Sequence, residues 1–247
     1  TGDGPAVVLV HGITSSRDDW GPVADLLVDQ GYTVVGVDQR GHGDSTVGGD
    51  GFGADRLGAD LEEVLRELDL KDVTLVGHSM GGIAAMSYAI DHAASFSERV
   101  SGLVLVATIA RTSRAYQRFG LRLLDDLLPL ASNDIAIGRP VSAYSLFGKF
   151  GSTKLVAAAK ASALRADREA IESCAIALGS YDISKRLGDI ALPVRLIYGN
   201  RDIVTPIFEN RRIVNGIDRA VSREVPGAGH LLIWTHPQDV CEEIQLA

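Results

Sequence analysis

The sequence predicts an α/β fold built on a mostly parallel, doubly wound sheet, and three observations carry this prediction. Short apolar segments rich in β-branched residues alternate along the chain with longer segments of helical periodicity. The apolar segments are nearly continuous, as expected for strands buried on both faces of a sheet. One connection between successive strands is far too long for a simple loop. Together these patterns indicate a parallel sheet covered by helices on both sides, with one inserted segment.

The individual elements follow from these patterns in chain order. Strands are predicted at residues 5–10, 33–38, 73–77, 102–107, 193–198 and 221–225. Helices are predicted around residues 18–30, 55–69, 81–94, 207–215 and 236–245. The first of these helices opens with Asp18 and Asp19, whose carboxylates suit the positive end of the helix dipole. Trp20 then serves as a core anchor between this helix and the sheet.

The long connection lies between the strands at 102–107 and 193–198. About 80 residues separate them, whereas a strand-to-helix loop usually has two to six. Helical stretches are predicted there at residues 113–130, 141–147, 153–164 and 167–178. We therefore expect an α/β core formed by residues 1–110 and 189–247, and a helical cap, or lid, formed by residues 111–188.

The most informative motif is Gly77-His78-Ser79-Met80-Gly81, which directly follows an apolar strand and enters an Ala-rich helix. A serine at such a sharp strand-to-helix turn has strained backbone angles, so small residues must flank it. Its hydroxyl is presented above the sheet at the positive end of the helix. This context describes a nucleophile elbow, with Ser79 as the nucleophile.

Partners for Ser79 follow later in the chain. Asp202 lies in the loop after the strand at 193–198, and His230 follows the last strand through Pro226-Gly-Ala-Gly229. A seryl hydroxyl needs a base to accept its proton and a carboxylate to orient that base. The order Ser, Asp, His, each residue after its own strand, predicts a catalytic triad.

Two backbone N–H groups are expected to form the oxyanion hole. One belongs to Met80, the residue after the nucleophile. The other belongs to Ile13, in the loop His11-Gly12-Ile13 that follows the first strand. We interpret His11 as a histidine that organises this loop rather than as a second base.

On these motifs the chain resembles the α/β-hydrolase superfamily, in the group that carries a lid after the sixth family strand. The resemblance covers essentially the whole chain, because His11-Gly12, residues 38–45, residues 77–81, Asp202 and Gly229-His230 follow in the family's order. It implies an α/β-hydrolase fold with Ser79, Asp202 and His230 as the triad. A serine at position 79 argues against the dehalogenase and epoxide hydrolase branches, which need a carboxylate there.

The resemblance implies a serine hydrolase that cleaves a small-molecule carboxylic ester without a cofactor or a metal. The same triad also serves perhydrolases and haloperoxidase-like enzymes, lactonases and thioesterases, and the motifs do not choose among them. A ligand-binding receptor on a hydrolase scaffold is the alternative from another class, against which the intact triad argues. The motifs select neither the acyl chain nor the alcohol nor an oligomeric state.

Aromatic and apolar residues of the cap, together with the residue before the nucleophile, are candidates for lining the substrate pocket. These candidates are His78, Tyr116, Phe119, Leu123, Tyr144 and Phe147, with Phe150 beside them. The cap also has 12 Lys and Arg against 7 Asp and Glu, whereas the rest of the chain has 12 against 25. We expect this imbalance to reflect attraction between cap and core, or contact of Arg111, Arg114 and Arg118 with an anionic substrate group.

Composition excludes several other classes. The net charge of −8 argues against a nucleic-acid partner, which needs a basic face. No apolar run approaches the roughly 18 to 20 residues that span a bilayer. Cys174 and Cys241 have no metal-ligand spacing and form no disulfide framework, so we expect a reducing, cytoplasmic location. Only residues 1–4 precede the first strand, so either the native chain begins earlier, with the β-hairpin usual in the family, or this hairpin is absent. We expect the first.

Overall fold

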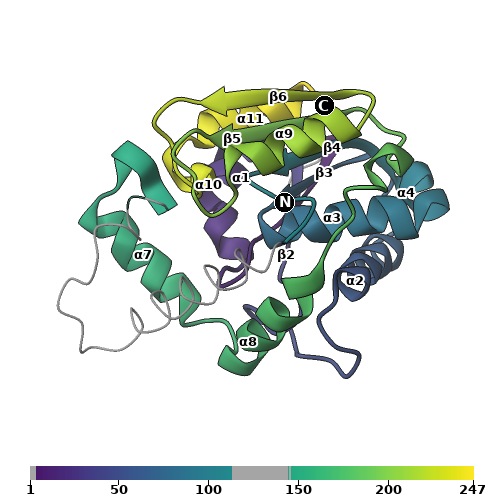
Figure 1. Ribbon diagram of the computed structural model, residues 1–247, viewed down its shortest axis with the longest axis horizontal. Helices are drawn as coiled ribbons and strands as arrows, with labels where there is room; N and C mark the ends of the chain where they lie inside the picture. Colours follow the sequence, from purple (N-terminus) through teal and green to yellow (C-terminus); the bar gives the residue numbers. More distant parts are fainter. Residues whose placement is uncertain (1–3, 113–143, 145) are drawn as a thin grey trace.

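The fold is built on one parallel sheet, seen in a computed structural model that describes residues 4–112, 144 and 146–247 (Figure 1). Its six strands lie in the order β2-β1-β3-β4-β5-β6, and every neighbouring pair is parallel. The strands are β1 Ala6–Val10, β2 Thr33–Val37, β3 Val73–His78, β4 Val100–Val106, β5 Val194–Gly199 and β6 Ala220–Val225. The predicted fold class and all six predicted strands are thereby confirmed.

Helices cover both faces of the sheet, as the continuous apolar strands predict. Side chains of β1 alternate between the two faces: Val8 and Val10 join one buried cluster, while Val7 and Leu9 join the other. The first cluster is completed by α2 Ala54–Glu67, α3 Met80–Asp91, α4 Ala93–Arg99 and α9 Ile207–Gly216. The second is completed by α1 Gly21–Asp29, α10 Leu232–Thr235 and α11 Pro237–Gln245. The sheet is therefore doubly wound.

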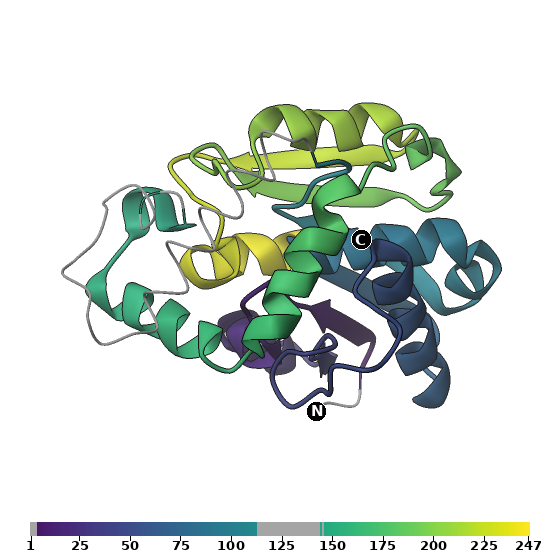
Figure 2. The ribbon, with the colours of Figure 1, turned by 60° about the horizontal axis from the view of Figure 1, so that its bottom comes forward.

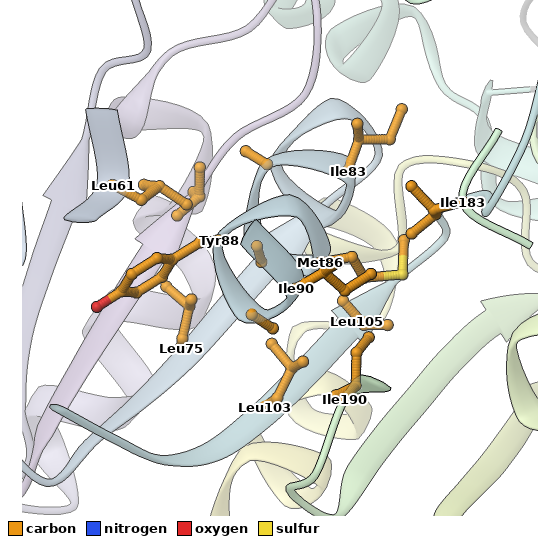
Figure 3. Packing of buried hydrophobic residues seen from close by; sticks show 14 of the residues in the cluster. Leu61, Leu75, Ile83, Met86, Tyr88, Ile90, Leu103, Leu105, Ile183 and Ile190 are labelled. Carbon is orange, nitrogen blue, oxygen red and sulfur yellow. The ribbon is translucent and has the colours of Figure 1, made fainter. Parts of the chain in front are cut away.

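Helix α3 lies at the centre of the first cluster, and all but its last residue are buried. Figure 3 shows Leu75, Leu103 and Leu105 of the sheet packed around it, together with side chains of neighbouring segments. A side chain at Gly58 of α2 would lie 2.8 Å from the backbone nitrogen of Tyr88, so glycine there lets the two helices approach closely. This packing fixes the helix whose first turn follows Ser79.

The opposite face is anchored by Trp20, which is 1% exposed and ends a short 3₁₀ helix, η1 Arg17–Trp20. This confirms its predicted role as a core anchor. On the same face, Arg195 of β5 reaches Glu243 of α11, with 2.8 Å between Nε and Oε2. Because Glu243 is almost fully buried, this pairing satisfies a charge that would otherwise be costly.

Between β4 and β5 many of the described residues are helical. Helix α7 stands apart from the sheet, as Figures 1 and 2 show, whereas Cys174, Leu178 and Leu187 pack into the first buried cluster. The helical residues form η3 Gly148–Phe150, α7 Thr153–Ala163, α8 Arg168–Ala177, η4 Leu178–Ser180 and η5 Leu187–Asp189. Helices α7 and α8 match the stretches predicted at 153–164 and 167–178. Residues 144, 146 and 147 are also helical, within the predicted stretch 141–147. The helix predicted at 113–130 lies outside the described residues.

Both ends of this insertion are tied together. A β-bridge joins Arg111 to Asp182, and the flanking hydrogen bonds are Thr112 N–H to Tyr181 O at 2.8 Å and Ile183 N–H to Ala110 O at 2.9 Å.

Further bonds join the insertion to the core. Asp167 N–H donates to Gly41 O at 2.9 Å, and Ser162 Oγ donates to Asp19 at 2.6 Å. Arg165 forms ion pairs with Asp18 and Asp44, as the charge imbalance predicts.

Three helical features differ from the prediction. The helix predicted at 18–30 begins as the 3₁₀ helix η1, so its α-helical part, α1, starts at Gly21 and not at Asp18. The helix predicted at 81–94 is divided at His92, whose φ of −125° and ψ of 40° interrupt α3 and start α4. The short helix α10 was not predicted, because four residues are too few to show a period. Among the described residues, no helix combines the length and the apolar character needed to cross a membrane.

Candidate active site

The predicted site residues lie at one edge of the sheet, because all strands are parallel and each residue follows a carboxyl end. Ser79 follows β3, Asp202 follows β5 and His230 follows β6. The strand order also places β1 beside β3, where the direction of winding reverses. Open α/β sheets bind their ligands at such a switch point.

Ser79 has the strained backbone that the motif predicts, with φ of 52° and ψ of −115°. The two flanking glycines are required by close backbone contacts. A Cβ at Gly77 would lie 2.4 Å from Gly81 O, and one at Gly81 would lie 2.2 Å from Val10 O. Ser79 N–H donates to Val106 O at 3.0 Å, so β4 braces the turn.

Asp202 and His230 are hydrogen-bonded to each other, and both are buried. The distance between His230 Nδ1 and Asp202 Oδ2 is 2.9 Å. Because the carboxylate accepts, Nδ1 carries the proton, and Nε2 of the neutral ring is left as the basic nitrogen. This is the tautomer that a general base next to a serine requires.

His78 connects the elbow to the loop of His230. Its Nε2 donates to His230 O at 3.1 Å, and the centroids of the two imidazole rings lie 4.8 Å apart. The edge of its ring also meets Trp20 at a centroid distance of 6.4 Å. Burial, together with the nearby His230, holds the pKa of His78 well below its usual value. This predicted pocket residue is therefore a neutral, enclosed ring that holds Ser79 beside the His230 loop.

The two segments that carry the predicted oxyanion donors both lie next to Ser79. Met80 is the first residue of α3, and an N–H at this position has no acceptor within its own helix. The loop that contains Ile13 also reaches the serine, because a Cβ at Gly12 would lie 3.0 Å from Ser79 Cβ.

His11 joins the loop after β1, which contains Ile13, to the turn after β2, which contains Gln39. Its Nε2 accepts from Gln39 N–H at 3.0 Å, and its Nδ1 therefore donates to Gly12 O at 2.7 Å. The amide of Gln39 donates in turn to His11 O at 2.5 Å. Burial and the neighbouring His42 lower the pKa of His11 to about 4, so the ring is neutral. These contacts agree with the interpretation of His11 as a loop-organising residue.

The charged turn after β2 also ties loops together. Asp38 accepts from the backbone N–H of Arg17 at 2.7 Å and of Asp44 at 3.1 Å. Burial acts to raise the pKa of Asp38, but these two N–H groups and the Arg17 guanidinium outweigh it and lower the pKa. Arg40 makes a bidentate pair with Asp60, at 2.6 and 2.7 Å.

The structure describes only part of the predicted pocket lining. Phe147 is fully buried and stacks on Trp234 at a centroid distance of 6.2 Å, whereas Tyr144 is largely exposed. Phe150 is also exposed and meets His236 edge-on at 4.5 Å. Arg111 pairs with the buried Glu209 at 3.4 Å. The remaining candidates, Tyr116, Phe119, Leu123, Arg114 and Arg118, lie outside the described residues.

Sequence reasoning missed three supports of the site. The segment before α7 runs along the His230 loop: Leu231 N–H donates to Leu146 O at 2.7 Å, and Lys149 N–H donates to Gly227 O at 2.9 Å. Thr108 Oγ donates to Ser79 O at 2.7 Å, and Thr205 Oγ donates to Asp202 at 2.5 Å. No local pattern marks these residues, because each contact joins segments that are distant in the chain or depends on the fold of a loop.

No cluster of three or more His, Cys, Asp or Glu residues that could hold a metal ion occurs in the described part of the chain. The described residues thus bring a hydrogen-bonded Asp202–His230 pair and the strained turn of Ser79 to the same edge of the sheet.

A family-wide sequence comparison decides the classification. The family described as "alpha/beta hydrolase fold" matches residues 5–133, more than half of the chain. The chain belongs to the α/β hydrolase fold family. Among curated relatives, this α/β hydrolase is 29% identical to the non-heme chloroperoxidase CPO-A1 of Kitasatospora aureofaciens, over 93% of this chain and 86% of the relative. It is 28% identical to a putative non-heme chloroperoxidase of Synechocystis, over 97% and 89% of the two chains.

Solved structures show the same fold. A bromoperoxidase from Bacillus anthracis superposes on this α/β hydrolase with a TM-score of 0.85 and 24% identity, covering 99% of this chain and 92% of the other. The esterase EaEST from Exiguobacterium antarcticum gives the same TM-score and identity, over 100% and 92%. At this identity the two structures establish the fold and leave the reaction open.

Proposed function

We propose that this α/β hydrolase is a serine hydrolase that cleaves a small-molecule carboxylic ester through an acyl-enzyme on Ser79. The observation that carries the proposal is the buried pair of Asp202 and His230, hydrogen-bonded at 2.9 Å and joined through His78 to the strained elbow. A buried, oriented imidazole next to a strained serine is the arrangement that activates a hydroxyl nucleophile.

In the proposed reaction, Nε2 of His230 takes the proton of Ser79 as its Oγ attacks the ester carbonyl. The N–H groups of Met80 and Ile13 stabilise the oxyanion, and His230 then protonates the leaving alcohol. Water, deprotonated by His230, attacks the acyl-enzyme and releases the acid. Asp202 keeps the imidazole in the Nδ1–H tautomer and stabilises the imidazolium that forms in each step.

We also propose that residues 111–188 are a cap over this site, and that residues 1–110 and 189–247 form the core. Two observations support this division. The β-bridge between Arg111 and Asp182 joins the two ends of the insertion, and residues 146–149 contact the His230 loop. A cap in this position excludes water and shapes the substrate pocket.

The experiment that tests the proposal is covalent labelling with a fluorophosphonate, followed by peptide mass spectrometry. One label on Ser79, lost in Ser79→Ala, is expected, together with turnover of p-nitrophenyl esters in a panel from two to sixteen carbons. Labelling at another residue, or no labelling of folded protein, rejects the triad. Single-turnover hydrolysis without release would instead favour a ligand-binding receptor.

A second candidate reaction uses the same acyl-enzyme. The curated relatives named above are called non-heme chloroperoxidases, which favours a perhydrolase or haloperoxidase-like activity. Hydrogen peroxide would then replace water, attack the acyl-enzyme and release a peracid. Peracid formation from acetate and hydrogen peroxide, compared with ester turnover on the same preparation, separates the two. Lactones and thioesters belong in the same panel.

A further inference from the structure

The carboxylate of Asp202 has four hydrogen-bond donors within its own site. Oδ1 accepts from Val204 N–H at 2.8 Å and from Thr205 N–H at 2.9 Å. Oδ2 accepts from His230 Nδ1 at 2.9 Å and from the Thr205 hydroxyl at 2.5 Å. A carboxylate has about four lone-pair sites, so this set occupies all of them.

The four donors divide into two pairs with different consequences. The backbone N–H groups of Val204 and Thr205 both bind Oδ1, the oxygen that does not contact His230. The Thr205 hydroxyl is the second donor on Oδ2, the oxygen that holds His230. Its hydrogen bond therefore restrains the orientation of Oδ2, and with it the direction of the oxygen's remaining lone pair toward His230.

Thr205 is itself fixed. It is 1% exposed, and its carbonyl accepts from Asn210 Nδ2 at 2.8 Å. Asn210 belongs to α9 and is fully buried. Because water has little access to a side chain this deeply enclosed, a lost Thr205 hydroxyl would not be replaced easily.

Helix capping does not account for the hydroxyl. Threonine near a helix start usually caps the helix by accepting from its first N–H groups. Here Pro206 occupies the N-cap position of α9, and the Thr205 hydroxyl donates back to Asp202.

We infer that Thr205 is a positioning residue: its hydroxyl orients the Asp202 carboxylate so that Oδ2 holds His230 in the basic tautomer. The inference rests on the proposed function, because it concerns the same triad. Thr205 does not touch the reacting atoms, and its effect passes through Asp202 to His230.

The test compares Thr205→Val, which keeps the shape and loses the hydroxyl, with Thr205→Ser, which keeps the hydroxyl. We expect Thr205→Val to lower kcat and the rate of fluorophosphonate labelling by about tenfold, the effect of one lost buried hydrogen bond, with KM changed less than about twofold. Thr205→Ser should recover most of that loss. Thr235→Val is the control: it removes a hydroxyl that donates to Leu231 O at 3.2 Å and lies 2.8 Å from His236 Nδ1, whereas the Thr205 hydroxyl donates to Asp202.

Two activity results overturn the inference. If the labelling rate and the kcat of Thr205→Val both lie within about twofold of the wild-type values, the hydroxyl has no positioning role. If Thr205→Ser is as slow as Thr205→Val, the γ-methyl group rather than the hydroxyl matters. Should Thr205→Val fail to fold, Thr205→Ala compared with Thr205→Ser distinguishes the same two explanations.

A readout without substrate separates this inference from the proposed function. The Nδ1 proton of His230, followed by NMR, should exchange with solvent faster in Thr205→Val than in the wild type and Thr205→Ser. Equal exchange in all three contradicts the inference even if Ser79 is labelled. Absence of labelling in the wild type, with the expected differences in exchange, would instead contradict the proposed function alone.

Discussion

His230 and Asp202 are joined by a buried hydrogen bond of 2.9 Å between Nδ1 and Oδ2. The bond connects loops at the ends of two neighbouring parallel strands, β5 and β6. It leaves Nε2 as the acceptor of the ring, so the reactivity proposed for Ser79 depends on which ring nitrogen carries the proton.

Replacing Asp202 with asparagine should lower kcat by roughly 10³-fold or more while KM changes little, because the asparagine amide can favour the wrong tautomer of His230. Steady-state ester kinetics measure the effect, and circular dichroism checks folding. Asp38→Asn is the matched control. Since Asp38 ties Arg17 and Asp44 together, that variant should mainly lower the melting temperature. The reverse pattern would show that the acid is misassigned.

Replacing Ser79 with alanine should abolish fluorophosphonate labelling and lower kcat by roughly 10³-fold or more, because the nucleophile is removed. The protein should still fold, since no cavity larger than a hydroxyl is created. Alanine has a Cβ as serine does, so the backbone strain at φ of 52° stays about the same. Ser101→Ala, on an exposed position of β4, should keep full activity. Residual turnover above about a tenth in Ser79→Ala would exclude the proposed nucleophile.

Replacing Gly81 with alanine should destabilise the fold by about 3 kcal/mol, the upper end of the usual cost of overpacking, because the new Cβ would lie 2.2 Å from the backbone atom Val10 O. Urea unfolding measures the change. Gly21→Ala is the control: it adds a Cβ with no atom within 4 Å and lies in a helix, so its stability should change by less than about 1 kcal/mol. Equal stability of the two variants would refute the close contact at the elbow.

Stability should fall as the pH is lowered from 6.5 toward 4. The pKa of His11 is lowered to about 4 in the folded protein from 6.5, so in this range the unfolded chain binds a proton that the folded protein excludes. The contribution of neutral His11 to the free energy of unfolding is fully present above pH 6.5, and about 3 kcal/mol of it is lost by pH 4. Urea unfolding at four pH values measures it. His11→Gln should make the dependence shallower, because burial also lowers the pKa values of His42 and His78 and their contributions remain. An unchanged slope in that variant would contradict the assignment to His11.

Much of the fold could be predicted because its signals are local. Each strand is a short run of apolar residues, and each observed strand lies within two residues of its predicted bounds. The strand predicted at 102–107 starts at Val100 and ends at Val106, because Ala107 turns away with φ of 45°. The break at His92 was missed, since nothing in the neighbouring residues disturbs the helical pattern.

The candidate site was predictable where the backbone geometry of a motif requires particular residue types. Gly77, Ser79 and Gly81 are such a case, because the strained turn dictates small residues around the serine. The support given by Thr205 was not predictable. Its hydroxyl reaches Asp202 only because the loop folds back on itself and Asn210 fixes it from α9.

By itself the sequence determined the strands, the order of the site residues and the requirement for glycine at the elbow, since periodicity and backbone sterics act within a few residues. Only the tertiary structure decided which loops meet. His78 donates to the backbone of a residue 152 positions away, and Gly148 lies so close to Gly227 that a Cβ would come within 2.1 Å of its carbonyl. Such contacts follow from the order in which strands pair, and packing across the whole chain sets that order.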